Sequence, residues 1–140
     1  MDSPAPLLLL AAILLIAIVG VIVLLFSTKN SPKLNVAKYQ TKWLAIENSI
    51  SRDNAASLQL GILQADKLLD QALRERRFKG QTMGERMKSA NHVWKNANHV
   101  WNAHKIRNQL AHETDAHVTY ETTLRALSAF KQALKDVGAI

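Results

Sequence analysis

The sequence predicts an all-α protein, with an N-terminal transmembrane helix followed by a four-helix up-down bundle. The first observation is an apolar run of 20 residues without a single charged side chain near the N-terminus. The second is the recurrence, from Leu34 onward, of apolar residues at spacings of three and four, with no alternating strand pattern and no Asn-Gly or Asp-Gly turn. These patterns divide the chain into an anchor at 1–28, a short tether at 29–34 and a helical bundle at 35–140.

The apolar run extends from Leu7 to Phe26. At about 1.5 Å per residue it covers about 30 Å, the thickness of a bilayer core. Asp2 precedes the run, whereas lysines, beginning with Lys29 and Lys33, follow it. A cleaved secretory signal is the alternative, but it would have a basic start, a shorter apolar run and a small-x-small cleavage site. The flanking charges therefore favour a single-pass anchor in the plasma (inner) membrane, with the N-terminus outside and the C-terminal domain cytoplasmic.

Helix start and stop signals separate the four predicted helices of the bundle. "SRDN" interrupts the chain after the first helix, and "TMGE" has the Thr-x-x-Glu pattern of a capping box. The capping box opens either a short helical piece or the third helix itself. The predicted helices cover residues 35–50, the segment from 55 to about 78, the segment through 90–112, and 119–137.

The third predicted helix contains a short repeat, in which "ANHVW" at 90–94 returns at 97–101. Seven residues make nearly two helical turns, so both copies would face the same way. We therefore expect Val93 and Val100 to stack along one helix against its neighbours, and Trp94 and Trp101 to do the same. Two copies are too few for a solenoid.

Polar residues continue this apolar stripe toward the C-terminal end of the same helix. At 100° per residue, His104, Arg107, Asn108 and His112 fall on the arc that Val100 begins. Burying so many polar groups without partners would cost several kcal/mol. The stripe is therefore expected to emerge into a cleft, a partner surface or a polar network.

Two interpretations of the polar stripe stay open. In the first, it is a structural network in which Arg107 bonds Glu113 or Asp115 and His112 caps the helix. In the second, it is an anion site, where the forked guanidinium of Arg107 binds phosphate and His112 exchanges a proton near neutral pH.

The segment "RNQLAH" at 107–112 resembles the Arg-x4-His motif of the HEPN superfamily, the higher eukaryotes and prokaryotes nucleotide-binding domains. Asn108 stands at the polar position after the arginine, and the resemblance covers about 36–140. It implies a helical bundle that pairs with a second copy and cleaves RNA without a metal, leaving a 2′,3′-cyclic phosphate. It further implies that His112 moves protons, Arg107 stabilises the developing charge and Asn108 positions the reacting group. We add His104, from its place on the arc, as a substrate-binding residue.

Composition is consistent with this hypothesis but does not select it. The net charge of +7 suits RNA phosphates and anionic lipid equally well. His92 and His99 share a face, but without cysteine or an intervening carboxylate they make a poor zinc pattern, so we expect no metal and no cofactor. The expected partners are the lipid bilayer, RNA, and a second copy in a homodimer or higher homo-oligomer. The alternative is a non-catalytic, membrane-anchored dimerisation or interaction module that binds a protein partner at the membrane.

Overall fold

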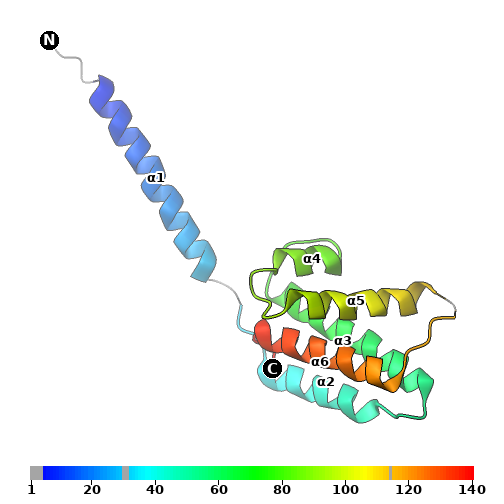
Figure 1. Ribbon diagram of the computed structural model, residues 1–140. Coiled ribbons are helices and arrows are strands. Elements are labelled where there is room, and N and C mark those ends of the chain that lie inside the picture. Colours follow the sequence, from blue (N-terminus) through cyan, green and yellow to red (C-terminus); the bar gives the residue numbers. More distant parts are fainter. Residues whose placement is uncertain (1–4, 30–31, 114) are drawn as a thin grey trace. The chain divides into compact units, whose positions relative to one another are not determined.

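The computed structural model describes residues 5–29, 32–113 and 115–140, with side chains in the first range described for residues 8–23. Within these ranges the chain forms six helices and no strand, which confirms the all-α prediction. The chain divides into two units, Met1–Ser31 and Pro32–Ile140, which are described separately (Figure 1).

The N-terminal unit contains one helix, α1 (Ala5–Lys29). Its described large apolar side chains are all exposed, from 45% at Ile22 to 70% at Ile16. The side chains of Leu7 and Phe26, which bound the predicted span, lie outside the described residues, as do positions 30 and 31 of the tether. Across the described residues, no helix combines the length and the hydropathy needed to cross a bilayer.

The second unit is built from five helices: α2 (Val36–Ser49), α3 (Ala55–Glu75), α4 (Met83–Ser89), α5 (Ala97–His112) and α6 (Tyr120–Asp136). Each helix begins at an asparagine or threonine whose side chain accepts a hydrogen bond from the backbone three residues later. The predicted count of four helices is not confirmed, because the third predicted helix is divided into α4 and α5.

Helix α3 is the centre of this unit and contacts α2, α4, α5 and α6. In Figure 1, α2, α3, α5 and α6 run along a common direction. Side chains that meet between them are fully buried, among them Tyr39 of α2, Ile62, Leu69 and Leu73 of α3, and Phe130 of α6. This core holds α3 and α5 in a fixed relation, which positions the polar residues they carry.

The stacked repeat predicted for residues 90–101 is wrong. The first copy lies between α4 and α5, and only the second copy is helical. The indole N–H of Trp94 donates to the carbonyl of Met87 at 3.0 Å, which folds this tryptophan back onto α4. The side chain of Asn96 then accepts from the backbone N–H of His99 at 3.2 Å and starts a new helix. A local cap has overridden the seven-residue period.

Helix α3 ends at Glu75, before the end predicted near Phe78. Arg77 takes a left-handed backbone conformation with φ of 62°, and the N–H of Phe78 donates to the carbonyl of Leu73 at 3.0 Å. This arrangement satisfies a carbonyl at the helix end and turns the chain toward α4. The turn brings the start of α4 beside a groove that α3 and α5 also line.

Candidate functional site

A groove of about 890 Å³ lies between α3, the start of α4 and the middle of α5. Gly84 of α4 lines the groove, and a Cβ added there would lie 3.9 Å from the ring of Trp101. The polar residues that line the groove come from all three helices. They include Asp66, Asp70, Arg86, His104, Arg107 and Asn108.

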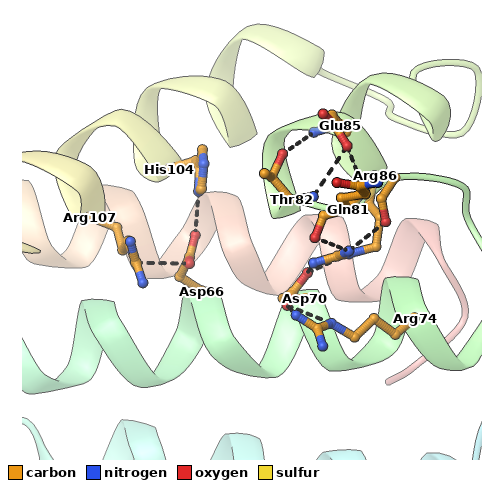
Figure 2. Close-up of polar contacts among 10 residues, drawn as sticks. Asp66, Asp70, Arg74, Gln81, Thr82, Glu85, Arg86, His104 and Arg107 are labelled. Carbon is orange, nitrogen blue, oxygen red and sulfur yellow. Dashed lines mark hydrogen bonds and ion pairs between the residues drawn. The ribbon is translucent and has the colours of Figure 1, made fainter.

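A carboxylate on α3 holds a histidine on α5. Asp66 is only 3% exposed, and its Oδ1 lies 2.7 Å from Nδ1 of His104 (Figure 2). Asp66 was not among the residues predicted from the sequence. The available signal was its place among inward-facing residues of α3, one turn after Ile62 and just before Leu69. A buried carboxylate must be paired, because an isolated charge would be too costly to remove from water.

This contact fixes which nitrogen of the neutral His104 ring carries the proton. An ionised carboxylate only accepts hydrogen bonds, so Nδ1 donates to Asp66 and Nε2 is left as an acceptor. Nδ2 of Asn108 lies 3.2 Å from Nε2 and donates to it, while Oδ1 of Asn108 accepts from Nη1 of Arg107 at 3.0 Å. The four side chains thus form one network with a consistent direction of donation.

Arg107 also reaches Asp66 directly. Its Nε lies 3.2 Å from Oδ2 of Asp66, as an ion pair whose geometry is not that of a hydrogen bond, so the buried Nε–H has no hydrogen-bond acceptor in the described part of the chain. The side chain of Arg107 is 35% exposed. The guanidinium is therefore anchored on one side and open to the groove on the other, which suits it to bind an anion.

A second carboxylate on α3, Asp70, holds the loop between α3 and α4. Nε of Arg86 donates to Asp70 at 2.7 Å, and Nε of Arg74 donates to it at 2.9 Å (Figure 2). Nη1 of the buried Arg86 donates to the carbonyls of Gly80 at 2.8 Å and Gln81 at 3.1 Å. Arg86 thus fixes the loop that leads into the α4 wall of the groove.

The predicted capping box at the start of α4 is confirmed. The hydroxyl of Thr82 accepts from the backbone N–H of Glu85 at 3.2 Å, and the carboxylate of Glu85 accepts from the backbone N–H of Thr82 at 3.3 Å. The same carboxylate accepts from the backbone N–H of Gln81. These backbone hydrogen bonds, that from Gln81 first, lower the pKa of Glu85.

Of the predicted site residues, the structure brings His104, Arg107 and Asn108 together in the groove. His112, the last residue of α5, is exposed and does not line the groove. Five residues turn a helix by about 500°, so His112 points about 140° away from Arg107. Arg107 pairs with Asp66 rather than with Glu113 or Asp115, the partners considered in the structural interpretation.

A second groove, of about 560 Å³, runs between α5 and α6. Its apolar lining comes from Val100, Ala103 and Ile106 of α5 and from Ala126 and Ala129 of α6. This groove was not predicted from the sequence, because it depends on how two helices pack.

The described residues contain no group of three or more His, Cys, Asp or Glu side chains placed to hold a metal ion. Comparison of the whole chain with protein-family models, curated proteins and solved structures finds no match. The function is therefore inferred from the chemistry of the groove and from the motif that lies beside it.

Proposed function

We propose that this chain is a membrane-anchored, HEPN-like domain that binds RNA in the groove between α3 and α5 and cleaves it by metal-independent acid/base chemistry. The observation that carries the proposal is the contact of one buried carboxylate, Asp66, with both His104 and Arg107 at the wall of an open groove. A titratable ring and a guanidinium held side by side are the groups that phosphodiester cleavage requires.

The charge of the groove supports a polyanionic ligand. Four basic side chains line it, those of Lys67, Arg74, Arg86 and Arg107, against the two acidic side chains of Asp66 and Asp70. Asp66 and Asp70 are largely buried, whereas Arg74 is 63% exposed. Positive charge therefore faces the solvent, where phosphate groups would meet it.

The chemistry follows from the RNA backbone. A ribose 2′-hydroxyl attacks the adjacent phosphorus, and negative charge grows on the phosphate oxygens as the bond forms. Arg107 stabilises that charge, and Asn108 orients the neighbouring groups. The motif resemblance gives His112 a proton-carrying role. Because His112 lies outside the groove of its own chain, this role requires a second copy of the chain to bring its His112 to the site.

We further propose that residues 7–26 anchor the domain in the plasma (inner) membrane, with the domain on the cytoplasmic side. The support is the run of 20 uncharged residues and the lysines that follow it. The full chain should stay with the membrane fraction after extraction at alkaline pH, and should be released if three leucines of the run are replaced by lysine. Release of the unmodified chain by alkali would overturn the anchor.

The RNA proposal is tested with the full chain in detergent micelles, incubated with mixed single-stranded RNA and a metal chelator. We expect fragments that end in 2′,3′-cyclic phosphate, and we expect Arg107→Ala to abolish them. Lys105→Ala is the matched control, because Lys105 lies on the exposed side of α5, two residues from Arg107. Intact RNA after incubation with the unmodified chain would contradict the proposed cleavage.

The second candidate is a non-catalytic interaction module, and the apolar groove between α5 and α6 favours it. An apolar groove between two helices suits a helix from a partner or from a second copy of the chain. Ala129→Glu would place a charge in this groove. If the chain is an interaction module, this variant should lose self-association in analytical ultracentrifugation, and the unmodified chain should leave RNA intact.

A further inference from the structure

We propose that His104, held by Asp66, is the residue that takes the proton from the ribose 2′-hydroxyl in the groove, and that Asp66 is its positioning residue. This inference rests on the proposed RNA cleavage and deepens it. The sequence motif alone points to His112 for this role. The structure places a different histidine beside Arg107.

The imidazole ring of His104 is held by its neighbours. His104 Nδ1 lies 2.7 Å from the carboxylate of Asp66, and the two side chains are 12% and 5% exposed. The ring of Trp101 lies edge-on to the imidazole, with ring centroids 6.2 Å apart and ring planes at 75°. A carboxylate that accepts from one ring nitrogen fixes both the orientation of the ring and its tautomer.

Nε2 of His104 is the atom that would take the proton. With Nδ1 donating to Asp66, Nε2 carries the lone pair, and Asn108 donates to it at 3.2 Å. A 2′-hydroxyl that donates to Nε2 takes the place of this amide. Arg107 contacts the same amide at 3.0 Å, so the phosphate next to that ribose falls beside the guanidinium. His104 and Arg107, which both contact Asn108, are thus placed to meet a hydroxyl and its adjacent phosphate.

The reaction then balances without any other reactant. The proton of the 2′-hydroxyl passes to Nε2 of His104 as O2′ forms a bond to phosphorus. The bond from phosphorus to O5′ breaks, and O5′ takes the proton from the imidazolium through a water molecule. The products are a 2′,3′-cyclic phosphate and a 5′-hydroxyl, and His104 returns to its neutral form.

The surroundings of His112 differ from those of His104. Its side chain is exposed at the end of α5, and it makes no hydrogen bond or ion pair with the other residues that the structure describes. Among the described residues, no carboxylate orients it. Within one chain, His104 is therefore the histidine whose geometry is fixed for proton transfer.

The test compares single-turnover cleavage of an RNA oligonucleotide by the full chain in micelles and by five variants. His104→Gln keeps a polar side chain toward Asp66 but cannot carry the proton, so its rate should fall by about 10²-fold to 10⁴-fold. His104→Gly should fall similarly and should recover in part when imidazole is added, which a purely structural role would not produce. His117→Gln is the control, because His117 is exposed in the segment between α5 and α6.

Asp66→Asn tests the positioning role. The amide of this variant can still contact the ring of His104 but no longer favours a proton on Nδ1. The cleavage rate should therefore fall, while the dissociation constant for RNA stays within about two-fold of that of the unmodified chain. The dependence of the rate on pH between 5 and 8 should also change. Asp66 of α3 and Arg107 of α5 are the charged groups that the described structure places on this network. A merely structural change would lower all rates without altering that profile.

The outcomes separate the two proposals. If the unmodified chain does not cleave RNA, the proposed function fails. If it cleaves RNA, but His104→Gln keeps the rate and His112→Gln abolishes it, the assignment of His104 fails while the proposed function stands. Circular dichroism of each variant establishes that it is folded.

Discussion

Asp66 and His104 are 38 residues apart in the chain, yet Oδ1 of one lies 2.7 Å from Nδ1 of the other. The contact joins the central helix α3 to α5, and both side chains are largely buried. It therefore contributes to the stability of the bundle as well as to the chemistry of the groove.

Replacing Asp66 with alanine should destabilise the folded chain by about 1–3 kcal/mol, because it removes the hydrogen-bond acceptor of His104 and the ion-pair partner of Arg107. Urea denaturation followed by circular dichroism measures this change. Asp53→Ala is the matched control, since Asp53 is exposed in the turn between α2 and α3 and should change stability by less than about 0.5 kcal/mol. Equal effects of the two substitutions would show that the Asp66 network contributes nothing to stability.

RNA binding by the groove should depend on salt in a way that identifies Arg107. Arg107→Ala should weaken binding and reduce the slope of log K against log salt by about one unit, because one phosphate contact is lost. Fluorescence anisotropy with a labelled oligonucleotide at several salt concentrations measures the slope. Arg107→Lys should keep most of the slope. An unchanged slope in Arg107→Ala would mean that this guanidinium does not contact phosphate.

Gly80 should tolerate no side chain. Its φ of +147° is unfavourable for other residues, and an added Cβ would lie 2.6 Å from the backbone nitrogen of Arg86. Gly80→Ala should therefore destabilise the chain by about 1–3 kcal/mol. The comparison is Gly84→Ala in helix α4, where the nearest atom would be 3.9 Å away and alanine should be neutral or stabilising. Thermal unfolding of the two variants should give shifts of opposite sign or very different size.

Stability should fall in acid partly through Glu47. The hydrogen bond from Lys131, 2.7 Å long, is the main cause that lowers the pKa of Glu47 in the folded chain. The pKa of Glu47 is thus lower in the folded chain than in the unfolded chain, where it is about 4.3. The ion pair therefore stabilises the fold at pH values above the unfolded pKa, and this stabilisation is lost as the pH falls through the folded pKa. Glu47→Gln should reduce the difference in Tm between pH 7 and pH 3.

Lys131→Gln should reduce that difference in the same way, because it removes the donor instead of the acceptor. If neither substitution alters the dependence of Tm on pH, the ion pair between α2 and α6 does not contribute to acid unfolding.

The sequence was informative where the signal is local. Helix caps, the box formed by Thr82 and Glu85, and the shared arc of His104, Arg107 and Asn108 all depend on residues within a few positions of one another. Such patterns are readable because helical geometry alone fixes them.

The missed features depend on tertiary packing or on competition between local signals. No periodicity could show that Asp66 meets His104, because the contact requires α3 and α5 to lie side by side. The division of α4 from α5 was left open by the sequence, because the repeat has the period of a continuous helix, while Asn96 supplies an N-cap that begins α5. His112 was predicted to share the arc with Arg107, but five residues turn a helix by about 500°, which places it at the opposite edge of that arc and outside the groove.

Asp66 and Asp70 are one turn apart on α3, and each holds a different element: Asp66 holds α5, and Asp70, through Arg86, holds the start of α4. Four residues of helix rise about 6 Å. Because both carboxylates stand on one rigid helix, the backbone of α3 sets how far apart α5 and the start of α4 are held along the groove.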